Sequence, residues 1–230
     1  MAKSKTGRGT PTTPGSIPVP SNDLHDTITR MTWPKDQVIH RIHLNLYDGA
    51  RFNPGVKGNA RFSPIKHANG TSIPTLYGGT TFDCAAMETV FHDVPFAAGL
   101  KTYDKLKLVG QVYSQVTPQR DLILADLSVT ALRKIGIKRS QLIDTEKDRY
   151  PETRTWAEAI HAQCPDIDGL SWIPRQDDRA RALVLFGNRV PESTLVQTAG
   201  PLDLTTNSDV YSDLLQLADR IGAKIVGVSF

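Results

Sequence analysis

The order of the predicted strands and helices restricts the fold of this chain more than any other feature. Apolar or alternating runs predict strands, and apolar residues at helical spacing predict helices, but the two kinds of segment do not alternate regularly. A parallel doubly wound sheet requires such an alternation, so we expect an α+β fold instead, a compact core with mixed, mostly antiparallel sheets and surrounding helices. The predicted strands are 37–43, 75–79, 106–116, 121–127, 169–173, 182–186 and 225–228, and the predicted helices are 82–94, 151–163 and 208–221, with a short helix after Ser128.

The composition changes along the chain and indicates a tail followed by one domain. Residues 1–20 are rich in Thr, Pro, Gly and Ser, and such a segment has too little apolar area to offset the entropy lost on ordering. We therefore expect residues 1–35 to form a disordered or extended tail. Residues 36–230 are expected to fold as a single domain that ends in a helix and a strand.

Charge, apolar runs and cysteines exclude several classes of protein. The net charge is +3, and Lys and Arg are scattered, so no direct binding to nucleic acid is expected. The sequence has no secretory signal and no apolar run of membrane-spanning length, which predicts a protein without membrane attachment. Cys84 and Cys164 have no disulfide or metal-ligand spacing, so we expect no metal and a reducing cytoplasm.

Four residues in the N-terminal half carry the sharpest chemical signal. They are Arg41 in V-I-H-R-I-H, Arg61 in G-N-A-R-F-S-P, Tyr77 in T-L-Y-G-G and Glu88 in A-A-M-E-T-V-F-H. Guanidinium groups match the oxygens of a diphosphate, and a tyrosine combines a flat apolar face with a polar tip. A carboxylate stabilises the cation that forms when a glycosidic bond breaks. These residue types together suit the cleavage of a dinucleotide.

Each of the four residues also has a plainer interpretation that the residues alone leave open. Arg41 can pair with a structural carboxylate, and Arg61 can be a solvated loop residue. Tyr77, in a predicted strand, can belong to the core. Glu88 lies beside the apolar stripe of its predicted helix and can be an ordinary solvated residue.

The series, followed by D-G-L-S-W-I-P-R-Q and A-L-V-L-F-G-N-R-V, resembles the RES-domain family over about residues 37–190, and leaves 191–230 as a C-terminal helix–strand extension. The resemblance implies a core similar to that of ADP-ribosyltransferases and a toxin that depletes NAD by hydrolysis or phosphorolysis. It implies NAD as a substrate and no tightly bound cofactor. It also implies a partner antitoxin with an Xre-type helix-turn-helix region. An alternative within the family is a toxin that ADP-ribosylates a protein.

The resemblance also implies roles for individual residues. Glu88 would stabilise the ribosyl cation, with Arg41 and Tyr77 as further catalytic residues. The residues expected to contact NAD are Arg41, Arg61, Tyr77, Ser171 and Trp172, although Trp172 can equally be core packing.

One departure from the family pattern concerns its serine. The chain has Pro174 at the position where the family usually has this serine, and proline offers neither a hydroxyl nor a backbone donor. Ser171 lies three positions earlier, an odd offset that points to the opposite face of a strand. A third hypothesis is therefore a catalytically weak module that mainly binds an antitoxin.

Overall fold

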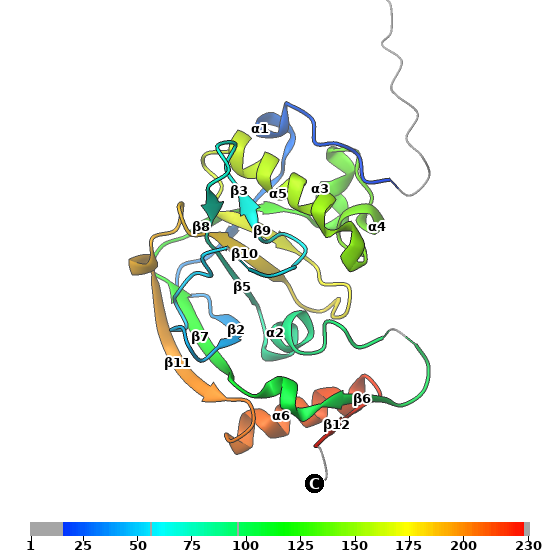
Figure 1. The fold of residues 1–230 in the computed structure, drawn as a ribbon. Helices are drawn as coiled ribbons and strands as arrows, with labels where there is room; N and C mark the ends of the chain where they lie inside the picture. Colours follow the sequence, from blue (N-terminus) through cyan, green and yellow to red (C-terminus); the bar gives the residue numbers. More distant parts are fainter. Residues whose placement is uncertain (1–15, 56, 96, 228–230) are drawn as a thin grey trace, which may run out of the picture.

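The computed structural model describes residues 16–55, 57–95 and 97–227. Its centre is an eight-stranded sheet in the order β1-β8-β9-β10-β5-β2-β7-β11 (Figure 1). Only β8 and β9 run parallel among these neighbours, so the sheet is mixed and mostly antiparallel and the α+β prediction is confirmed. Its strands are β1 (Arg30–Trp33), β2 (Ile39–Leu44), β5 (Thr75–Gly79), β7 (Gln111–Pro118), β8 (Leu122–Asp126), β9 (Gly169–Trp172), β10 (Ala182–Phe186) and β11 (Leu195–Asp203).

Two small sheets and the helices complete the fold. Helices α1, α3, α4 and α5 gather at one end of the molecule, α6 lies at the other end, and α2 lies between them (Figure 1). No helix in the described residues has the length and apolar character needed to cross a membrane. The small sheets pair β3 (Ile65–Lys66) with β4 (Ser72–Ile73) and β6 (Lys101–Asp104) with β12 (Ala223–Val226), and the helices are α1 (Leu24–Thr27), α2 (Phe82–Thr89), α3 (Val129–Lys134), α4 (Arg139–Leu142), α5 (Tyr150–Gln163) and α6 (Ser208–Arg220), with 3₁₀ turns at Lys105–Leu108, Lys147–Arg149 and Glu192–Thr194.

Side chains alternate across the large sheet and fill separate apolar clusters on its two faces. Along β10, Leu183 and Leu185 belong to one cluster, whereas Val184 and Phe186 face the other side. That other side carries two clusters, one around α5 and a second around α2 and α6. The helical face of the sheet is therefore divided between two separate cores.

The N-terminal tail is shorter than the sequence predicted. Leu24, Ile28 and Trp33 are buried, and β1 pairs with β8 at the edge of the large sheet. The prediction of a disordered or extended tail through residue 35 is therefore wrong for 24–33, because these apolar side chains complete the core beside α5 and β8. Residues 1–15 lie outside the described part of the chain.

Two other predicted elements differ in their bounds. Helix α2 ends at Thr89 rather than at 94, because the amide of Phe91 bonds to the carbonyl of Ala86, five residues back. Its N-cap is Thr81, whose side chain accepts from the amide of Cys84. The strand predicted from 106 begins at Gln111, after a 3₁₀ turn. The long edge strand β11 was not predicted.

The C-terminal helix and strand agree closely with prediction. Helix α6 covers 208–220, and Leu214 and Leu217 are buried in the cluster around α2. The strand predicted over 225–228 is β12, which begins earlier, at Ala223, and residue 228 falls outside the described residues.

The burial of α1 predicts that this segment stabilises the whole fold. We expect Leu24→Ala to lower the free energy of unfolding by about 2–5 kcal/mol, because a fully buried leucine leaves a cavity. Val19→Ala is the matched control, since Val19 is 86% exposed, and should change stability by less than about 0.5 kcal/mol. Urea denaturation measures both. Equal stability of the two variants would show that residues 24–28 do not contribute to the fold.

Candidate active site

The candidate site lies where strands β2 and β5 separate. The two strands share a single residue pair, His40 with Gly79, whereas β2 pairs with β7 along its whole length. At this pair the backbones approach closely, since a Cβ on Gly78 would lie 2.4 Å from Cγ2 of Ile39. Past the pair, Arg41 to Leu44 of β2 have no partner strand on the β5 side, and a cavity opens there.

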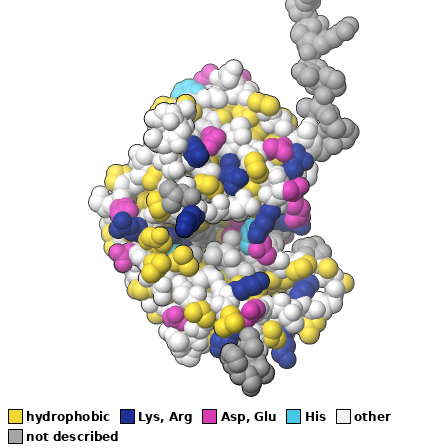
Figure 2. Space-filling model, viewed as in Figure 1, with side chains coloured by type: hydrophobic (Ala, Val, Ile, Leu, Met, Phe, Trp, Pro, Cys, Tyr) yellow, Lys and Arg dark blue, Asp and Glu magenta, His cyan; other side chains and the backbone are white. Residues whose placement is uncertain are grey.

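All four residues of the N-terminal series line this cavity, which has a volume of about 470 Å³. They are Arg41, Arg61, Tyr77 and Glu88. A second cavity of about 410 Å³ shares part of its lining, including Arg61 and Glu88, and we call the two together the cleft. Figure 2 shows a hollow across the middle of this face with charged side chains of both signs around it. The structure thus gathers residues that are up to 47 positions apart (88 − 41).

Arg41 is buried without a carboxylate partner. Only 6% of the residue is exposed, and its Nη1 donates to the carbonyls of Gly49 and Arg51, the latter at 3.0 Å. Its Nε has no hydrogen-bond partner, and no acidic group in the described residues pairs with it. Burial lowers the pKa of Arg41 to about 10, so the group stays positive at neutral pH. The interpretation of Arg41 as half of a structural ion pair is wrong.

Arg61 is also buried and also lacks a carboxylate partner among the described residues. Its Nη1 donates to the backbone carbonyl and the hydroxyl of Thr145, the carbonyl at 3.2 Å. Its Cζ lies 5.1 Å from the centroid of the Tyr150 ring, in a cation–π contact. Arg61 is therefore not a solvated loop residue, because its guanidinium is fixed by both contacts.

The charges around the larger cavity favour an anionic ligand. Two buried guanidinium groups without carboxylates leave a positive field that an anion can neutralise. Basic side chains outnumber acidic ones in the lining of this cavity. The acidic residues are Glu88 and Asp93, and the basic ones are Arg41, Arg51, Lys57, Arg61 and Lys147.

Tyr77 combines a core contact with a place in the cavity wall. Its ring packs edge-to-face against Trp172 with the centroids 6.0 Å apart, and its hydroxyl accepts a hydrogen bond from the amide of Phe62 at 2.9 Å. Burial raises the pKa of Tyr77, so the phenol is neutral. The ring is therefore held in a fixed position in the cavity wall.

Glu88 is the acidic residue most available to a ligand. It lies on the last turn of α2, half-buried, and its carboxylate makes no hydrogen bond or ion pair with any other described residue. Burial raises the pKa of Glu88, whereas the positive charges of Arg61 and His92 act to lower it. The interpretation of Glu88 as an ordinary solvated residue does not fit this position.

Two of the expected NAD contacts lie behind the cavity wall. Trp172 is 1% exposed and packs against Phe62 and Tyr77, and the fully buried Ser171 donates its hydroxyl to the carbonyl of Ala182 at 3.1 Å. Neither lines either cavity of the cleft, so the expectation that they contact NAD directly is not supported. Pro174 is buried as well, and its carbonyl accepts from Arg139.

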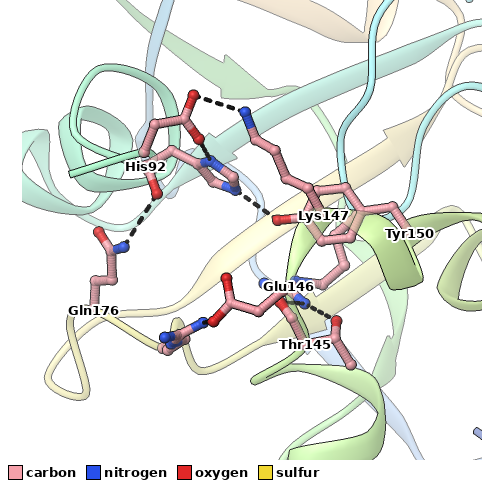
Figure 3. Close-up of polar contacts among 9 residues, drawn as sticks. His92, Thr145, Glu146, Lys147, Tyr150 and Gln176 are labelled. Carbon is pink, nitrogen blue, oxygen red and sulfur yellow. Dashed lines mark hydrogen bonds and ion pairs between the residues drawn. The ribbon is translucent and has the colours of Figure 1, made fainter. Parts of the chain in front are cut away.

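The cleft also contains a polar network that the sequence did not predict (Figure 3). His92 bonds to the hydroxyl of Tyr150 at 2.7 Å and to Asp93 at 2.8 Å, and Lys147 pairs with Asp93 at 2.6 Å. His92 follows Glu88 by four positions, but no sequence pattern joins it to Tyr150, 58 positions later.

The comparison with protein families identifies the chain. The model of the RES domain matches residues 38–207, which is 170 of the 230 residues. The chain belongs to the RES-domain family. The match extends past Val190 and includes β11, so the RES domain covers more of the chain than the motifs alone indicated. No curated protein and no solved structure matched.

Membership of the RES-domain family gives the site a general context. The family is linked to enzymes that act on NAD and to toxin–antitoxin systems, in which a RES protein pairs with an antitoxin. The positive lining, the tyrosine and the unpaired carboxylate of this cleft are consistent with an NAD-related function.

His43, beside Arg41 in the RES domain, is held neutral by its surroundings. It is 8% exposed, its Nδ1 donates to the carbonyl of Leu44 at 3.0 Å, and its Nε2 accepts from the hydroxyl of Ser114 at 2.9 Å. Burial, and then the charge of Arg41, lower the pKa of His43 to about 4.

This lowered pKa predicts a loss of stability in acid. The unfolded chain binds the proton of His43 near pH 6.5 and the folded chain only near pH 4, so stability falls between these values, by about 3 kcal/mol from this group. His43→Gln should lose that part of the pH dependence, and His25→Gln, which removes an exposed histidine, should keep it. Urea denaturation from pH 7 to pH 4 measures the slopes. Identical slopes for wild type and His43→Gln would contradict the assignment.

Proposed function

We propose that this RES-domain protein is a toxin-type enzyme that cleaves the nicotinamide–ribose bond of NAD. One observation carries the proposal. Arg41, Arg61, Tyr77 and Glu88 line a single cavity in which both guanidinium groups lack a carboxylate partner in the described residues and the carboxylate lacks a cationic one. NAD supplies both missing charges, a diphosphate for the arginines and a positive nicotinamide ring for Glu88.

The two arginines bind the diphosphate in this proposal. Each guanidinium uses Nη1 for carbonyl or hydroxyl oxygens of the protein and has no hydrogen-bond partner at Nη2 among the described residues. The Nη2 groups therefore remain available for phosphate oxygens, and the bonds at Nη1 fix their direction. The ring of Tyr77, fixed by Phe62 and Trp172, packs against the nicotinamide end.

Glu88 acts on the bond that breaks. The electron pair of the C–N bond leaves with nicotinamide, which becomes neutral, and the positive charge moves to the ribose. An ionised Glu88 stabilises that charge from within hydrogen-bonding reach of the ribose hydroxyls. Water then adds to the ribose carbon and releases one proton, which gives ADP-ribose, whereas phosphate as the acceptor gives a phosphorylated ADP-ribose.

The biological setting follows from the family. We propose that an Xre-type helix-turn-helix antitoxin is the partner and that the protein acts in the cytoplasm, where NAD is available. NAD is then a substrate that is consumed, and the proposed reaction needs no tightly bound cofactor. Growth arrest on expression, relieved by the cognate antitoxin, would support this setting.

The first test follows the products of NAD over time. Purified wild type with NAD should release nicotinamide, and Glu88→Gln should slow that release by about 10²–10³-fold, because the charge that stabilises the ribosyl cation is lost. Glu192→Gln removes an exposed glutamate outside the cleft and is the matched control. Chromatography with and without phosphate separates ADP-ribose from its phosphorylated form and so identifies the acceptor.

The outcomes of this time course are distinct. If folded wild type releases no nicotinamide, the hypothesis that the protein hydrolyses or phosphorolyses NAD is overturned. A Glu88→Gln variant as active as wild type would leave the NAD-cleaving activity established but would contradict the role of Glu88 in it. Transfer of ADP-ribose to an added cellular protein, without free product, would favour the protein-modifying alternative.

The raised pKa of Glu88 predicts a pH dependence of the rate. Only the ionised carboxylate stabilises a cation, so kcat/KM should fall as the pH drops through a pKa above the usual glutamate value of about 4.3. The profile of nicotinamide release from pH 4 to pH 8 measures this limb. A rate that stays constant down to pH 4 would contradict the assignment.

A further inference from the structure

The guanidinium of Arg61 and the carboxylate of Glu88 are held by different parts of the chain. Glu88 lies on α2, whereas Arg61 is fixed by Thr145 and Tyr150, in the segment that leads into α5. The relative position of the two groups therefore depends on how the end of α2 is joined to the start of α5.

A chain of polar contacts makes that connection. The ammonium of Lys147 pairs with Asp93, Asp93 bonds to Nδ1 of His92, and Nε2 of His92 bonds to the hydroxyl of Tyr150 (Figure 3). The carboxylate of Asp93 accepts from Nδ1 of His92, and Nε2 of His92 shares a second hydrogen bond with the hydroxyl of Tyr150. The segment after α2 and the start of α5 are thus connected through Tyr150.

Tyr150 is buried outside the three apolar clusters of the fold. Only 1% of the residue is exposed. Its ring instead contacts the Arg61 guanidinium at 5.1 Å and the His92 ring, with the centroids 6.0 Å apart. Tyr150 also lines the second cavity of the cleft together with Arg61 and Glu88.

We propose that Tyr150 is a positioning residue for this site: its ring holds the guanidinium of Arg61, and its hydroxyl, bonded to His92, fixes that guanidinium relative to Glu88. The proposal rests on the proposed function, in which Arg61 binds the diphosphate and Glu88 stabilises the ribosyl cation. The ring of Tyr150 then supports binding of the diphosphate by Arg61. Its hydroxyl supports the position of Arg61 relative to Glu88 when the C–N bond breaks.

Two substitutions at Tyr150 separate the two parts of this role. Tyr150→Phe keeps the ring, so the Kd for ADP-ribose should stay within about twofold of wild type, while kcat for nicotinamide release falls about fivefold to tenfold. Tyr150→Leu loses the ring face as well, so the Kd for ADP-ribose should rise about tenfold. Calorimetry gives Kd, and nicotinamide release gives kcat and KM.

Two further variants guard against a purely structural explanation. Tyr103→Phe removes the hydroxyl of another buried tyrosine outside the cleft and should leave both constants unchanged. His92→Asn breaks the same hydrogen bond from the half-buried histidine and should reproduce the Tyr150→Phe pattern, even if Tyr150→Leu fails to fold.

The outcomes for this inference differ from those for the proposed function. An active wild type with unchanged constants in Tyr150→Phe and His92→Asn overturns the positioning role and leaves the proposed function intact. A folded wild type that neither binds ADP-ribose nor cleaves NAD overturns both. Retained ADP-ribose affinity with lowered kcat in these two variants supports the inference.

Discussion

Strands β2 and β5 pair at one position and then diverge, and the placement of the site depends on that divergence. Continuous pairing would have closed the sheet over the space that Arg41 and Tyr77 now line. Helix α2 begins three residues after β5, capped by Thr81, and packs back so closely that a Cβ on Gly79 would meet the sulfur of Cys84 at 2.4 Å. This short connection places the last turn of α2, with Glu88, at the opening between the strands.

The two arginines of the cleft show a conflict between folding and ligand binding. A buried charge without an opposite charge costs free energy, and the carbonyl oxygens that Arg41 and Arg61 contact offset only part of that cost. A protein selected for stability alone would place a carboxylate or an apolar side chain beside each group. Their retention in the described fold is understandable if an anionic ligand supplies the missing charge, since active sites are where such local conflicts concentrate.

Local patterns in the sequence predicted much of this structure. The bounds of β5 and β10 and most of α5 follow from apolar periodicity, and the four N-terminal residues were recognised because each lies in a short motif. Features that depend on distant partners were missed. Strand β1 is defined by its pairing with β8, and β11 by its pairing with β7. The position of Tyr150 in the site is defined by its contacts with Arg61 and His92. The hydroxyl of Ser171 bonds to the carbonyl of Ala182, a contact that depends on the pairing of β9 with β10 and not on the local motif.

The charges of the cleft are coupled through Arg61. Burial raises the pKa of Glu88, and the charge of Arg61 opposes that shift, so a diphosphate that neutralises Arg61 would by itself favour protonation of Glu88. NAD compensates for this effect, because its nicotinamide ring carries a positive charge to the same cavity. When the C–N bond breaks, that charge moves to the ribose and remains beside the carboxylate. In the proposed reaction, Glu88 therefore has a cationic partner from binding through bond cleavage, and a dinucleotide without the charged ring would not supply one.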